Sequence, residues 1–100
     1  MEKLKESIIN KAEKALKTAV IWSKLITTEN STTNKTRILN AENFISQFYA
    51  YMEVLWEIDI EEYVDFGSRT SEERKCVALA IDKIYEMGGN KCLMQLIGKN

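Results

Sequence analysis

The absence of proline is the feature that most constrains this chain. Its 100 residues include no proline and only four glycines, three of which follow Asp82. Proline and glycine interrupt helices, whereas the abundant Lys, Glu, Ala, Leu and Ile favour them or are tolerated in them. We therefore predict an all-α fold. The length corresponds to one domain with a thin core, so we expect residues 1–100 to form a single small helical bundle.

The first long helix is predicted over about residues 2–27. Its apolar residues recur at alternating intervals of four and three, which is the spacing of one helix face: Ile8, Ala12, Ala15, Ala19, Trp22 and Ile26. The next segment, TTENSTTNKT at 27–36, has no apolar residue. Ser, Thr and Asn side chains compete for backbone hydrogen bonds, so this segment is predicted to be a flexible polar loop.

A second long helix is predicted from Asn40, as its N-cap, to about Ile58. Its polar strip is narrow, and a helix that is apolar nearly all round must be surrounded. In a chain this small, either this helix is the central one of the bundle, or part of it meets another chain. We expect a homodimer, with self-association through four residues of this helix: Phe48, Tyr51, Met52 and Leu55.

The remaining elements are shorter. Asp59 and Glu62 have the spacing of a capping box, which predicts a third helix over 60–66 with Gly67 as its C-cap. A fourth helix of medium length is predicted to start at Thr70 or Ser71 and to end at Gly88-Gly89. A last short helix would carry four further residues: Cys92, Leu93, Leu96 and Ile97. The expected bundle thus has four to five helices: two long, one medium, and one or two short.

The stretch LWEIDIEEYVDFG at 55–67 carries five acidic residues and no basic one. It lacks the oxygen ligand and glycine that a calcium loop beginning at Asp59 needs at its fifth and sixth positions. Two interpretations remain: a solvated helix face, or a surface where acids and aromatic rings dock a basic partner protein. The candidate interaction residues are Glu53, Trp56, Glu57, Asp59, Glu61, Glu62, Tyr63 and Asp65.

Aromatic residues are more numerous than one small core needs. Tyr49, Tyr51, Trp56 and Tyr63 exceed what a bundle of this size readily accommodates. Tyrosine and tryptophan are favoured at protein interfaces, where the ring is buried and its polar tip stays satisfied. Their number supports the docking interpretation.

Charge is distributed unevenly along the chain. Residues 1–40 hold eight basic and four acidic residues, a net of +4, and residues 41–100 hold six and eleven, a net of −5, which gives the total of −1. The alternative to protein docking is a nucleic-acid-binding or ribonucleoprotein accessory subunit that uses the basic first helix, with four candidate phosphate contacts: Lys11, Lys14, Lys17 and Lys24. No helix-turn-helix is expected, because the candidate recognition helix begins with the acid-rich SEERK.

The sequence carries no convincing catalytic constellation. It has no histidine, so a Ser or Cys nucleophile would lack its commonest base, and the Glu-x-x-His pairs of di-iron bundles are absent. We expect a protein that is not an enzyme and that has no cofactor and no metal. No apolar run is long enough to span a bilayer, and the N-terminus lacks the apolar segment of a signal peptide, so we expect cytoplasmic residence without membrane association.

One short segment carries a family resemblance. TTNKTRILN, at 32–40, resembles the Thr-Thr…Arg…Leu segment of the small helical subunit of type III CRISPR complexes, over about a tenth of the chain, and the remainder does not follow that family. In size and helical build the chain is also similar to small bacterial immunity proteins and to phage-encoded inhibitors of host defence. The expected function is that of a non-enzymatic protein–protein interaction module, of the kind found in inhibitors, immunity-type proteins or phage anti-defence proteins that act by binding a partner protein.

Overall fold

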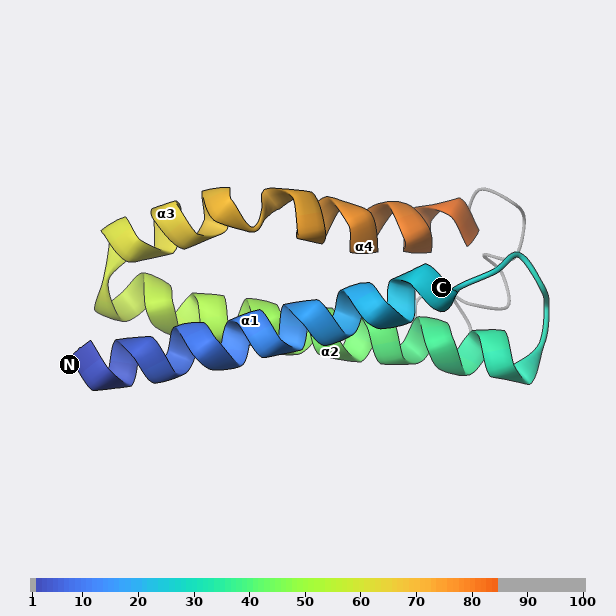
Figure 1. The fold of residues 1–100 in the computed structure, drawn as a ribbon, viewed down its shortest axis with the longest axis horizontal. Helices are drawn as coiled ribbons and strands as arrows, with labels where there is room; N and C mark the ends of the chain where they lie inside the picture. Colours follow the sequence, from blue (N-terminus) through green and yellow to red (C-terminus); the bar gives the residue numbers. More distant parts are fainter. Residues whose placement is uncertain (1, 85–100) are drawn as a thin grey trace.

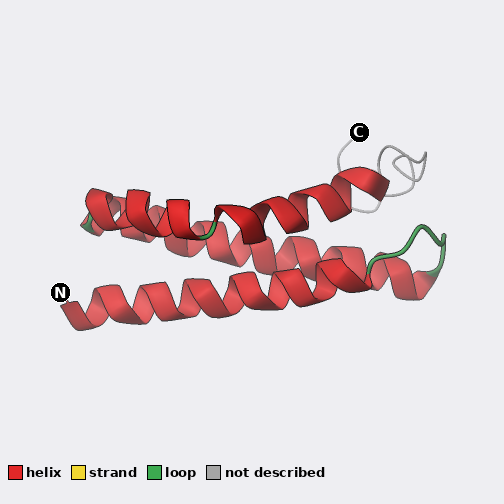
Figure 2. Cartoon of the chain, turned by 45° about the horizontal axis from the view of Figure 1, so that its top comes forward, coloured by secondary structure: helices red, strands yellow, loops and turns green. Residues whose placement is uncertain are grey.

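A computed structural model describes residues 2–84 of the chain. The elements are α1 (Glu2–Leu25), α2 (Thr32–Ile58), α3 (Ile60–Arg69) and α4 (Ser71–Ile84). α1 and α2 form an antiparallel hairpin, and α3 and α4 follow one another along its length as a third leg (Figure 1). Every element within residues 2–84 is helical (Figure 2). The all-α prediction is confirmed, whereas the last short helix lies outside the described residues.

α1 forms as its apolar spacing predicts. Ile8, Ala12, Ala15 and Ala19 are all buried, and Trp22 at the end of the same stripe is half-buried. Small alanine side chains allow the α1 backbone to approach its neighbour closely, which suits the tight hairpin with α2.

α2 begins earlier than predicted, and this corrects both the expected loop at 27–36 and the expected N-cap at Asn40. The cap is Ser31, whose hydroxyl accepts a hydrogen bond from the backbone N–H of Asn34 at 3.1 Å. Asn34 is itself buried and binds the backbone of the connection, so its polar side chain supports the helix instead of ending it. The non-helical connection between α1 and α2 therefore covers only residues 26–31.

α3 is longer than predicted because Gly67 does not end it. The helix continues to Arg69, and Thr70 closes it with a backbone N–H that donates to the Phe66 carbonyl at 3.1 Å. The Thr70 hydroxyl donates to the same carbonyl at 2.9 Å. The predicted cap at the other end is confirmed, since the Asp59 carboxylate accepts from the backbone N–H of Glu62 at 3.1 Å. α4 then starts directly at Ser71.

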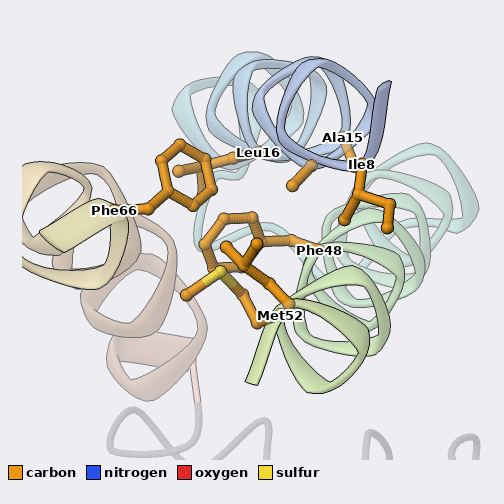
Figure 3. Close-up of a cluster of buried hydrophobic side chains, with 8 residues drawn as sticks. Ile8, Ala15, Leu16, Phe48, Met52 and Phe66 are labelled. Atoms are coloured by element: carbon orange, nitrogen blue, oxygen red, sulfur yellow. The ribbon is translucent and has the colours of Figure 1, made fainter. Parts of the chain in front are cut away.

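The main core lies where the three legs meet. Figure 3 shows Phe48 of α2 and Phe66 of α3 pointing toward one another, with Leu16 and Ile8 of α1 beside them. The two phenyl centroids are 6.1 Å apart, and both rings are fully buried. A second cluster joins Ile38 and Ile84 at the other end of the hairpin.

None of the helices within residues 2–84 combines the length and apolar character needed to cross a bilayer.

Candidate protein-interaction surface

An open groove lies between α2 and the leg formed by α3 and α4. It consists of two adjoining hollows, of about 1000 and 610 Å³, that share Tyr49, Met52 and Tyr63. No residue of α1 lines either hollow. We call this surface the α2–α3 groove and define it by Tyr49, Met52, Glu53, Trp56, Glu57, Tyr63, Val64 and Arg74.

Aromatic rings form the walls of the α2–α3 groove. Trp56 of α2 meets Tyr63 of α3 edge to face, with ring centroids 5.1 Å apart and planes at 84°. Tyr49 stands in a similar arrangement against the buried Phe48, at 5.3 Å. Trp56 and Tyr49 nevertheless remain 52% and 48% exposed. Large aromatic surface that is positioned by its neighbours but left open to solvent is typical of a binding site.

The apolar surface continues beyond the rings onto α3. Ile60 and Val64 are 51% and 58% exposed, and they are four residues apart, so they share one face of α3 next to Tyr63. The floor is apolar as well, since Met52 is buried and its methyl group lies 3.7 Å from the position a Gly67 side chain would occupy. The groove thus has a continuous apolar floor and one apolar lip.

The charges of the groove are separated along its length. Glu53 and Glu57 are the charged residues of the larger hollow, and within residues 2–84 neither forms an ion pair. Arg74 is the charged residue of the smaller hollow, where its Nη2 donates to the Gly67 carbonyl at 2.7 Å. One end of the groove is therefore negative, and the other carries a single guanidinium group.

The Asp59 side chain is only partly exposed, and its role is structural. Its Oδ2 lies 2.9 Å from Lys5 Nζ, in a contact that joins the start of α1 to the junction between α2 and α3. The hydrogen bond from Lys5, followed by the one from the Glu62 backbone, holds the pKa of Asp59 below its usual value. The hydrogen bonds with Asp59 and then Glu2 hold the pKa of Lys5 above its usual range.

Two further acids of the candidate set are paired within the chain. Arg69 lies 3.0 Å from the Asp65 carboxylate and 3.5 Å from that of Glu62. The same guanidinium group stacks over Phe66, 5.2 Å from the ring centroid. Glu61 is exposed but does not line the groove. Of the eight residues predicted for interaction, the structure brings four together in the groove: Glu53, Trp56, Glu57 and Tyr63.

The candidate set omitted residues that the sequence could have supplied. Tyr49 lies four residues before Glu53 and seven before Trp56, so all three share one face of α2. Ile60 and Val64 are likewise four residues apart, so they share one face of α3. Helical spacing from Trp56 points to Tyr49, and spacing from Tyr63 points to Ile60, whereas the acidic pattern points to neither.

The residues predicted for self-association lie mostly inside the chain. Phe48 and Leu55 are fully buried, Met52 is 6% exposed, and Tyr51 is half-buried against the same core. α1 and α3 already cover the surface that these side chains were expected to offer a second copy. The burial of Phe48, Met52 and Leu55 leaves these three side chains little surface to offer a second copy, and self-association through α2 stays a prediction.

The lysines proposed to contact phosphates are exposed on α1. Lys14, Lys17 and Lys24 lie on one helix face, and Lys11 lies to one side of it. None of the four forms an ion pair with another residue of the described part of the chain. This face is on a different leg from the α2–α3 groove.

Metal binding finds no support in residues 2–84, where no group of three or more potential His, Cys, Asp or Glu ligands comes together. Comparison of the chain with protein-family models, with curated proteins and with solved structures gave no match. Functional interpretation therefore depends on the residues of the groove.

Proposed function

We propose that this chain is a non-enzymatic protein–protein interaction module that binds its partner in the α2–α3 groove. The observation that supports this most is the half-exposed pair Tyr49 and Trp56 on an apolar floor, beside two carboxylates without an ion-pair partner in the described chain. Burying the open half of one such ring against a partner contributes on the order of 1–2 kcal/mol.

A role as inhibitor, immunity-type or anti-defence protein is consistent with this surface. Such proteins act by binding to and covering a surface of their partner. A helical scaffold that offers one binding groove is sufficient for this. The size and helical build of this chain support the same proposal, as a likeness of architecture alone.

The test is affinity capture with two matched variants. Val64→Arg places a bulky cation on the groove lip, at a site that is 58% exposed and tolerant of substitution. Leu79→Arg makes the same change on α4, at a site that is 63% exposed and outside the groove. We expect the wild type and Leu79→Arg to retain a stoichiometric partner that survives nuclease, and Val64→Arg to lose it. Equal capture by both variants would remove the groove from consideration.

Charge reversal should be confined to the acids of the groove. Glu53→Lys with Glu57→Lys changes two exposed carboxylates that have no ion-pair partner within residues 2–84. Reversing Glu62 would also remove its contact with Arg69 and so perturb the fold. We expect the double reversal to abolish capture while the circular dichroism melting curve stays unchanged.

A second candidate function is nucleic-acid binding through α1, which the exposure of Lys14, Lys17 and Lys24 supports. Binding of this kind weakens steeply with salt, because counterions are released from the phosphates. An oligonucleotide titration at two salt concentrations tests it, with Lys14→Glu and Lys17→Glu as the variant. Binding that is insensitive to this variant would exclude α1 as the contact.

The expected homodimer also remains a proposal. Since Phe48, Met52 and Leu55 are buried, a dimer through α2 would have to use the exposed residues of the groove. Sedimentation equilibrium at micromolar concentration distinguishes the cases: a monomer mass excludes the dimer, and a dimer mass abolished by Val64→Arg places it in the groove.

A further inference from the structure

The α2–α3 groove lies between helices, and this limits the shape of what can fill it. Within residues 2–84 every element is a helix, so the groove presents no strand edge to which an extended peptide could add. A helix packs naturally into the space between two helices, where its side chains fit the grooves of its neighbours. The lining of α2 from Ser46 to Glu57 spans about 16 Å, which corresponds to roughly three helical turns of a partner.

The charges limit the chemistry of that helix. Glu53 and Glu57 are one helical turn apart on the outer edge of the larger hollow, with no basic residue among its lining residues. The opposite lip carries Val64, which is exposed and apolar, and the exposed Ile60 lies one helical turn before it on α3. An occupant that satisfies both lips carries an apolar face flanked on one side by Lys or Arg at intervals of three or four residues.

We propose that the occupant of the α2–α3 groove is a basic amphipathic helix of a partner protein. This inference rests on the proposed function and adds the class of partner. Its apolar side chains pack on Tyr49, Met52 and Tyr63, and its basic side chains meet Glu53 and Glu57. The end of the partner helix that reaches Arg74 is its C-terminal end, where the carbonyl groups and the helix dipole are negative.

A second copy of this chain fits the groove less well than a different protein. The basic helix of this chain is α1, which lines no part of its own groove. The apolar stripe of α1 is already buried in its own core, so a second copy could offer the groove only the lysine face of α1 and no apolar face to pack on its rings. Charge complementarity thus favours a basic partner of another kind.

The probe is a pair of synthetic helical peptides, each of about 18 residues so that the helix forms readily. One contains Leu, Ala and Lys with the lysines beside the apolar face, and the other has every Lys replaced by Glu. The receptor in this experiment is the 100-residue chain with the substitution Trp22→Phe. Of the two tryptophans in the sequence, only Trp56 then remains. The fluorescence emission of Trp56 then reports binding in the groove, because Trp56 lines its larger hollow.

We expect the Lys peptide to shift the Trp56 emission and to bind more weakly as salt is added. Replacing Glu53 and Glu57 by Gln should weaken it about tenfold, and the Glu peptide should bind more weakly still. The matched control is Glu72→Gln with Glu73→Gln, which removes the same net charge from exposed sites on α4 outside the groove. This control should leave the affinity unchanged.

Three results would overturn the inference: equal binding of the two peptides, equal weakening by the two Gln double variants, or no binding of the Lys peptide. Each is distinct from failure of the proposed function. If Val64→Arg abolishes capture of a partner while the Lys peptide does not bind, the groove is the interaction surface and only the basic helix is wrong. If Val64→Arg leaves capture unchanged, the surface itself is wrong. A dimer mass that Val64→Arg abolishes would identify a second copy as the occupant.

Discussion

At the scale of single residues, Asn34 shows how a polar side chain can hold a fold together from inside. It is 2% exposed, yet all its polar atoms have partners. Its Oδ1 accepts from the Thr27 N–H at 2.8 Å, and its Nδ2 donates to the carbonyls of Thr27 and Glu29 at 2.8 and 2.9 Å. One side chain therefore satisfies three backbone groups of the connection between α1 and α2.

Asn34→Ala should destabilise the chain by about 2–3 kcal/mol, because three partly buried hydrogen bonds to the backbone of Thr27 and Glu29 are lost and the better helix propensity of alanine offsets only part of this. Chemical denaturation measures the change, with the exposed Asn30→Ala as the control that should fall within about 0.5 kcal/mol of wild type. Similar values for the two variants would show that the three hydrogen bonds contribute little.

At the scale of elements, Gly67 distinguishes two possible forms of α3: a helix that ends at a Gly67 cap, and a helix that continues through Gly67 to Arg69. A glycine that caps a helix in the left-handed conformation resists substitution, whereas a glycine inside a helix is its weakest residue. Gly67 lies within α3, and a side-chain carbon there would sit 3.7 Å from the Met52 methyl group, an ordinary contact.

Gly67→Ala is therefore expected to stabilise the chain by about 0.5–1 kcal/mol. Thermal unfolding monitored by circular dichroism measures it, and Ser68→Ala at the neighbouring exposed position shows how much arises from helix propensity alone. A loss of stability in Gly67→Ala would instead indicate that Gly67 caps α3.

Sequence patterns predicted these elements to the extent that the determinants are local. The stripe from Ile8 to Ala19 and the cap at Asp59 depend on neighbours a few residues away, and both predictions are confirmed. The start of α2 was misplaced because the partners of Asn34 lie five and seven residues back, across a turn. Composition alone assigned that polar segment to a loop.

At the scale of the whole molecule, the pair formed by Lys5 and Asp59 connects residues that are 54 positions apart. It holds the start of α1 against the junction of α2 and α3, next to the acidic stretch. No spacing rule relates these two residues, which is why the sequence assigned Asp59 to the docking surface. Arg69 similarly engages Glu62 and Asp65, so the acids available for docking are fewer than their number in the sequence suggests.

The pair should make stability depend on pH at both extremes. The pKa of Asp59 is lowered on folding, so its contribution is present above its unfolded value of about 3.9 and is lost as the pH falls through the lower folded value. The pKa of Lys5 is raised, so its contribution is present below about 10.4 and is lost as the pH rises through the higher folded value.

Asp59→Asn isolates this effect, because asparagine still caps α3 but carries no charge. Urea denaturation at a series of pH values should show wild type more stable near neutrality and the difference narrowing below about pH 4. The exposed Asp82→Asn on α4 is the control, with no comparable pH dependence. A constant difference across the acid range would mean that the ion pair contributes nothing.

Burial is shared unequally between the three legs, and this has a consequence for motion. α1 and α2 contribute six buried residues each, whereas α3 and α4 contribute three between them: Phe66, Val77 and Ile84. Cooperative units with fewer buried contacts open at lower free energy, so we expect the third leg to open before the hairpin itself unfolds. The α2–α3 groove lies between the hairpin and the third leg, so opening of the leg would change the width of the groove. A partner helix bound there, as proposed, would hold the third leg against the hairpin, so we expect binding also to stabilise the bundle as a whole.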